Sequence, residues 1–90
     1  MKYTKHGKSR AEERGIGENM ILKVISEPTY AYYDLSTGAT VAFKKLNRKH
    51  LLIVYSKKEN EIKIVTTFIT SAAQEIIEKK LKNNVWIKIK

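Results

Sequence analysis

The fold is decided by the stretch His50-Leu51-Leu52-Ile53-Val54-Tyr55-Ser56, which would be apolar on both faces if it formed a strand. An amphipathic surface strand alternates apolar and polar residues, whereas a strand covered on both faces reads as a continuous apolar run of this length. The sequence therefore predicts a central strand at residues 50–56, with the rest of the chain arranged around it.

Three further strands are expected around this segment. Residues 29–35 and 39–46, rich in aromatic and apolar residues, precede it on either side of a turn at 36–38. Residues 61–69 follow it after a hairpin loop at 57–60. Four consecutive strands joined by short loops predict an antiparallel meander. In the last strand, alternation predicts Ile62, Ile64, Thr66 and Phe68 on one face, and Lys63, Val65 and Thr67 on the other.

Helices are expected on either side of the meander. The first begins after an N-cap at Thr4 and ends at Gly15, and the second, from Glu18 to Glu27, is stopped by Pro28. A third spans residues 71–82, capped by Thr70 or Ser71, and a lysine-bearing edge strand covers 85–90. That strand pairs either with its own sheet or with a second subunit. The prediction is a single α+β domain over residues 1–90: two N-terminal helices packed on an antiparallel four-stranded meander, then a third helix and a short C-terminal edge strand.

The first predicted helix has almost no apolar side to bury. Its only small or apolar residues in mid-helix are Gly7 and Ala11. In contrast, His6, Arg10 and Arg14 follow one another at intervals of four residues, so they share one face over roughly 12 Å. The polar face is therefore either a solvated surface or the part of the helix that the protein uses.

The charge balance points to a polyanionic partner. The 90 residues carry a net charge of +9 and contain no cysteine. Nucleic acid is the first expectation, ahead of an acidic protein and an anionic membrane surface. With two histidines and no cysteine, no zinc pattern is present, and no cofactor is expected. The chain has no apolar run long enough to span a bilayer and no apolar leader, so a cytoplasmic protein is expected.

Several motifs together resemble a known family. The opening H-x3-R-x3-R-G-I is followed by a helix ending in Glu27-Pro28, a meander ending in V-T-T-F at residues 65–68, and a T-S pair before the next helix. This order resembles a small family of prokaryotic domains of unknown function that is grouped with RelE-like and BrnT-like toxins in the barnase-like ribonuclease superfamily. The resemblance spans about residues 3–86.

The resemblance implies a RelE-like domain that cleaves RNA without metal, as the toxin of a toxin–antitoxin pair. It also implies a site on the concave face of the sheet, fed by the first helix and the central strands. Carried over onto this chain, it implicates His6, Arg10 and Arg14, with Thr66 or Thr67 from the last meander strand. RNA, free or on the ribosome, and an acidic antitoxin are the implied partners, and the protein is expected to be a monomer or a homodimer.

The residue chemistry agrees with this implication. The imidazole of His6 suits a proton-transfer role, while Arg10 and Arg14 suit phosphate binding. Tyr55 is a candidate proton donor or stacking platform, and His50 is the second imidazole. The expected nucleic-acid-binding residues are Lys5, Lys8, Lys44, Lys45, Arg48 and Lys49, with tyrosines at 30, 32 and 33 as candidate stacking partners.

Two alternatives stay open. The chain is also compatible with a non-catalytic nucleic-acid-binding module, or with a domain that binds an acidic partner through its basic surface. A third, weaker pattern is Asp34 followed by Glu61 and Lys63, which echoes the D…E-x-K arrangement of nucleases that use magnesium. E-x-K arises readily by chance in so lysine-rich a chain.

Overall fold

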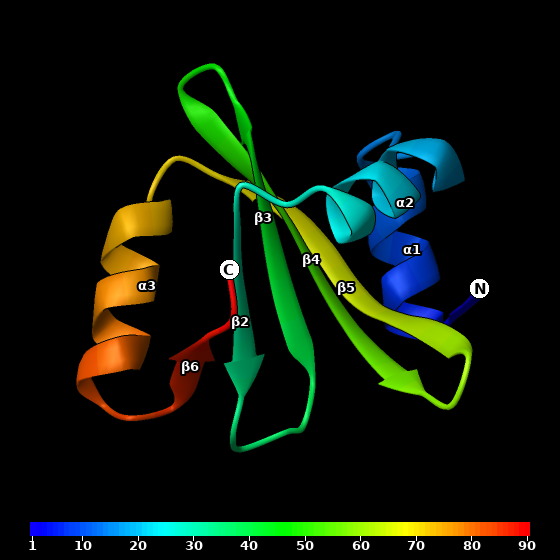
Figure 1. The fold of residues 1–90 in the computed structure, drawn as a ribbon. Helices are drawn as coiled ribbons and strands as arrows, with labels where there is room; N and C mark the ends of the chain where they lie inside the picture. Colours follow the sequence, from blue (N-terminus) through cyan, green and yellow to red (C-terminus); the bar gives the residue numbers. More distant parts are fainter.

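A computed structural model describes all residues from 1 to 90 and contains three helices and six strands (Figure 1). In chain order these are β1 (Lys2–Tyr3), α1 (Lys5–Glu13), α2 (Glu18–Ser26), β2 (Tyr30–Asp34), β3 (Thr40–Leu46), β4 (Lys49–Lys58), β5 (Glu61–Thr70), α3 (Ala73–Lys82) and β6 (Trp86–Lys88). The α+β class and every predicted helix are confirmed.

The strands form one sheet in the order β1-β5-β4-β3-β2-β6. The predicted meander is present as β2 to β5, all antiparallel, and β4 lies inside it with a partner on each side. The sheet is larger than the predicted meander, however. β6 pairs with β2 of the same chain, and β1 pairs in parallel with β5. β1 has only two residues, too few for alternation to mark a strand.

The two faces of the sheet carry separate cores, because side chains of a strand alternate between faces. On one face, Ile21 and Val24 of α2 and Ala11 of α1 pack against Leu51 and Ile53 of β4. On the other face, Ala73 and Ile77 of α3 pack against the sheet. Their partners are Tyr32 of β2, Phe43 of β3, Leu52 of β4 and Trp86 of β6. Figure 1 shows α1 and α2 together, well separated from α3.

The predicted alternation along β5 is wrong beyond Ile64. Val54 pairs with Thr66 and Tyr55 pairs with Ile64, so Val65 is an extra residue in a β-bulge. A bulge shifts the side-chain alternation by one position. Ile64 consequently packs in the core under α1 and α2, whereas Phe68 packs with the core under α3.

Several boundaries also differ from the predicted ones. β4 runs on to Lys58, which leaves only Glu59 and Asn60 as the hairpin loop, with Glu59 at a positive φ of 58°. α3 begins at Ala73 because Thr70 Oγ1 accepts the backbone N–H of Ala72 in a turn before the helix, at 2.9 Å. None of the three helices has the length and apolarity needed to cross a bilayer.

Candidate functional site

Thr4 anchors the start of α1 to β5. Its hydroxyl accepts the backbone N–H of Gly7 at 2.9 Å, which is the predicted N-cap. The same hydroxyl donates to the carbonyl of Val65 at 2.9 Å, and the backbone N–H of Thr4 donates to the carbonyl of Ile64 at 2.8 Å. One residue therefore both begins the helix and fixes it beside the bulge of β5.

Small residues let α1 lie directly on this strand. Gly7 and Ala11 are the buried residues of the helix, and a Cβ added at Gly7 would overlap the carbonyl oxygen of Ile64. The close approach is available only to glycine. With so narrow a contact stripe, α1 keeps most of its polar residues at the surface.

The end of α1 is fixed by a Schellman motif. Gly15 has a φ of 63°, as predicted for the residue that ends the helix, and its N–H donates to Glu12 O at 3.2 Å. The N–H of Ile16 donates to Ala11 O at 2.9 Å, and Ile16 packs against the core of α1 and α2. Arg14, the C-cap residue, is thereby held in a defined position next to the sheet.

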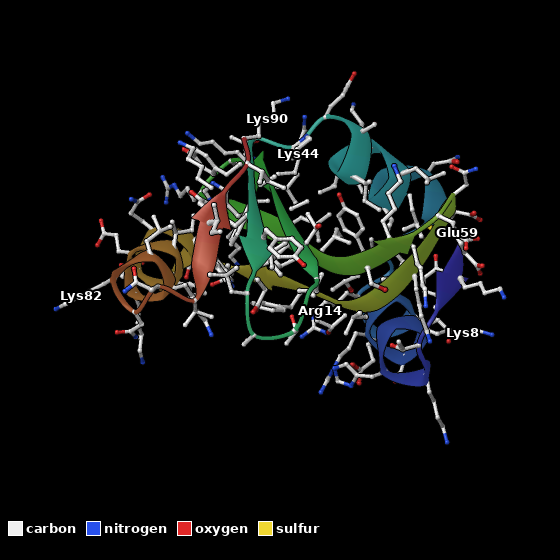
Figure 2. The ribbon with its side chains drawn as sticks, turned by 60° about the horizontal axis from the view of Figure 1, so that its bottom comes forward. Lys8, Arg14, Lys44, Glu59, Lys82 and Lys90 are labelled. Atoms are coloured by element: carbon white, nitrogen blue, oxygen red, sulfur yellow. The ribbon has the colours of Figure 1, made fainter.

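The row His6, Arg10 and Arg14 borders a shallow groove of about 400 Å³, whose other wall is the segment 66–69 of β5. β1 pairs only with Lys63 and Ile64, so no strand lies on the outer side of β5 along this segment. We name this site the α1–β5 groove. Figure 2 places Arg14 and Lys8 at opposite sides of α1.

Weak, exposed contacts hold the polar row together. Arg10 Nε donates to His6 Nε2 at 3.4 Å, and its Nη1 lies 3.0 Å from Glu13 Oε2. Arg14 Nη1 lies 3.7 Å from the same carboxylate oxygen. Exposed ion pairs of this kind contribute about 0 to 1 kcal/mol. An incoming phosphate can therefore displace Glu13 at little cost.

Thr67 lies in the groove wall and has an unpaired hydroxyl. The residue is 0% exposed, and its Oγ1 has no hydrogen-bond partner. A buried hydroxyl without a partner costs about 1 to 3 kcal/mol. Thr67 is thus the one predicted strand residue that combines a place in the groove with a free polar atom, while its neighbour Thr66 lines the same wall.

The other two proton-transfer candidates lie elsewhere. Tyr55 is half-buried against the core of α1 and α2 and does not line the groove. Burial raises its pKa above 10.0 despite an opposing hydrogen bond with Thr40, so the phenol is uncharged at neutral pH. His50 lies on the α3 side, with its ring centroid 5.9 Å from that of Tyr30 and 6.3 Å from that of Phe43.

The predicted lysines and Arg48 do not line the groove either. Lys5 and Lys8 lie on another side of α1, beside Glu12 and Glu13. The Nζ of Lys44 donates to the carbonyl of Glu27 at 2.8 Å, and Lys45 points to the opposite face of β3. The remaining two, Arg48 and Lys49, lie together at the tip of the β3–β4 hairpin. The basic residues thus occupy several surfaces.

The D…E-x-K residues do not form a metal site. The Asp34 carboxylate accepts hydrogen bonds from the backbone N–H of Ser36 at 2.9 Å, from the Ser36 hydroxyl at 2.6 Å and from Trp86 Nε1 at 3.2 Å. Glu61 pairs with Lys2 at 3.0 Å. No three acidic or histidine side chains converge anywhere in the chain.

Sequence reasoning missed two features of the site. Glu13 is the counter-ion of both arginines, and its i+3 spacing from Arg10 was a signal for this. A second groove, of about 470 Å³, has Phe68, Val54 and Trp86 in its mainly apolar lining and lies on the opposite face of β5 from Thr67. Its lining comes from six different strands and helices, so no local pattern marks it.

Comparison with known proteins gives a family and no close relative. The model of a domain of unknown function, DUF4258, matches residues 3–69. No curated protein and no solved structure matches the chain. The matched span runs from β1 to β5 and includes both walls of the α1–β5 groove, whereas α3 and β6 lie outside it. The chain therefore belongs to the DUF4258 family.

Proposed function

We propose that this protein binds RNA along the α1–β5 groove and cleaves it without a metal ion, as the toxin of a toxin–antitoxin pair. The observation that carries the proposal is the groove itself, where His6, Arg10 and Arg14 line up opposite the 66–69 segment of β5. An imidazole and two guanidinium groups match the needs of phosphodiester cleavage.

The two arginines supply the phosphate contacts. They lie on successive turns of α1, about 6 Å apart along its axis, so they can contact one RNA strand at two points. Guanidinium groups bind phosphate oxygens through paired hydrogen bonds and stay charged throughout. They also stabilise the extra negative charge that develops on the phosphate as the new bond forms.

His6 supplies the proton transfer. Its Nε2 accepts from Arg10, so this nitrogen carries the lone pair and serves as the base for a ribose 2′-hydroxyl. The freed 2′-oxygen attacks phosphorus, the bond to the 5′-oxygen breaks with its electron pair, and the imidazolium returns the proton to that oxygen. The products are a 2′,3′-cyclic phosphate and a 5′-hydroxyl, so DNA of the same sequence is bound without being cleaved.

The test is cleavage of an end-labelled single-stranded RNA in the presence of EDTA. The wild type is expected to cleave, and His6→Ala to be slower by about 10²- to 10⁴-fold. Lys8→Ala, on another side of α1, is the matched control and keeps the wild-type rate. Cleavage that depends on added magnesium would contradict the proposal. As a toxin, the wild type slows growth when expressed, and His6→Ala does not.

Binding without cleavage is the second candidate, and one observation favours it. His6 is the only imidazole among the residues lining the groove, and no carboxyl group lines it, so base and acid must be the same group. In this case the RNA stays intact in the complex, Arg10→Ala and Arg14→Ala weaken binding, and His6→Ala has little effect on affinity.

A further inference from the structure

Four large apolar side chains are exposed together at the β2–β6 end of the sheet. We name Tyr33, Leu35, Ile87 and Ile89 the β6 patch; they are 39%, 53%, 50% and 56% exposed. Tyr33 and Ile87 are paired across β2 and β6, so their side chains share a face. Ile89 follows two residues later, just past β6, where its N–H and that of Lys90 both donate to Ala31 O, at 2.9 Å and 3.1 Å, so these two residues oppose Ala31 in a β-bulge.

The patch adjoins an open sheet edge. β6 is the last strand of the sheet. Val85 O accepts from the N–H of Leu35, the residue after β2, at 2.8 Å, and Ile89 N donates to Ala31 O of β2 at 2.9 Å. The alternate residues Trp86 and Lys88 therefore direct their backbone groups to the outer side. An unpaired edge of this kind accepts an added strand.

The positive charge around β6 favours a negatively charged partner. Residues 79–90 contain no acidic side chain and five lysines, namely Lys79, Lys80, Lys82, Lys88 and Lys90. Figure 2 shows Lys82 and Lys90 projecting into solvent at the ends of this region. A second copy of the chain would set the same lysines against one another, which disfavours self-pairing.

The two faces of β6 differ in a way that defines the partner further. Ile87 and Ile89 lie on the face of the β6 patch, whereas Lys88 is paired with Tyr32 and lies on the opposite face. A strand added beside β6 also alternates between these faces. It meets apolar neighbours on one face and lysine on the other.

We propose that the β6 edge and the β6 patch bind an extended, acidic segment of another protein, in which apolar residues alternate with aspartate or glutamate. The apolar residues cover Ile87 and Ile89, and the carboxylates face Lys88, while Lys90 adds positive charge at the end of the edge. This interface is separate from RNA binding, because β5 and β6 lie toward opposite edges of the sheet with three strands between them.

The test uses two labelled peptides, one alternating isoleucine with glutamate and the other isoleucine with lysine. Fluorescence anisotropy is expected to show binding of the acidic peptide alone. Ile87→Thr with Ile89→Thr weakens that binding about tenfold or more. Lys88→Glu with Lys90→Glu shifts the preference toward the basic peptide. Circular dichroism confirms that each variant is folded.

The matched control removes two comparably exposed apolar side chains from α2. Met20→Gln with Leu22→Gln, whose parent residues are 41% and 40% exposed, leaves peptide binding unchanged. RNA binding persists in the Ile87→Thr, Ile89→Thr protein, and peptide binding persists in Arg10→Ala, so the two proposals fail independently.

Three outcomes would overturn the inference. The first is equal or absent binding of the two peptides. The second is binding that survives the double threonine substitution. The third is that the wild type is a dimer by light scattering and that the double threonine substitution dissociates it. That result would assign the patch to self-association.

Discussion

The hydroxyl of Thr67 is expected to affect stability and to leave binding unchanged. Valine has the same shape without the hydroxyl, so Thr67→Val removes an unsatisfied buried group and is expected to raise the free energy of unfolding by about 1 kcal/mol. RNA affinity is expected to stay unchanged, because the buried hydroxyl does not reach the surface of the groove. Urea unfolding and an RNA titration measure the two effects.

Thr66→Val is the control for this pair of effects. Thr66 is the preceding residue on β5 and is only half-buried, so its hydroxyl is reached by water. We expect its stability change to stay within about 0.5 kcal/mol. A Thr67→Val protein that is clearly less stable than the wild type would mean that the hydroxyl has a partner in the folded protein.

Asp34 makes stability depend on pH in the acid range. Burial raises its pKa, but hydrogen bonds from Ser36, Trp86 and Thr37 outweigh burial and hold the pKa below its ordinary value of 3.8. The folded state therefore binds this proton more weakly than the unfolded chain does. The stabilisation is complete above the unfolded pKa and is lost as pH falls below about 3.8 toward the folded pKa.

Asp34→Asn isolates this contribution. We expect the variant to be less stable than the wild type at neutral pH, and the difference to shrink as the solution is acidified through about pH 4 to pH 3. Urea unfolding at several pH values measures it. A stability difference that is constant across this range would show that the carboxylate charge has no part in the effect.

At the scale of elements, the sequence predicted α1 itself but not where α1 packs on the sheet. The N-cap at Thr4, the end at Gly15 and the single face shared by His6, Arg10 and Arg14 depend on residues within four positions of one another. The bond from Thr4 to Val65 joins residues 61 positions apart, at a bulge that no local pattern marks. Local chemistry thus identified the candidate row, and long-range pairing supplied its opposite wall.

The contact of α1 with β5 depends on the missing side chain at Gly7. Gly7→Ala is expected to lower the free energy of unfolding by about 1 to 3 kcal/mol, because the methyl group meets the carbonyl of Ile64. This figure is the net change, in which the cost of the overlap outweighs the helix-propensity gain of about 1 kcal/mol that alanine brings. Thermal and urea unfolding measure it.

Ser9→Ala serves as the matched substitution on the same helix. Ser9 is exposed, so only helix propensity changes, and a small gain in stability is expected. If Gly7→Ala were equally stabilising, α1 would not be held against β5 as closely as the structure has it, and the α1–β5 groove would be wider than described.

For the whole molecule, net charge predicts a polyanionic partner but not the surface that would bind it. The basic residues are divided among the α1–β5 groove, the β3–β4 hairpin tip and the β6 region. The net charge is +9 however the basic residues are distributed over the surface. Only the pairing of the strands decides which cations share a surface.

Salt dependence distinguishes these surfaces. Each phosphate contact on single-stranded nucleic acid adds about 0.7 to the slope of log affinity against log salt concentration. Arg10→Ala and Arg14→Ala are each expected to lower the slope by about that amount. Arg48→Ala with Lys49→Ala is expected to leave it unchanged, because the hairpin tip does not line the groove. An equal fall of the slope in the groove variants and in the hairpin variant would mean that the RNA strand extends from α1 to the hairpin. The groove would then be only one part of the nucleic-acid surface.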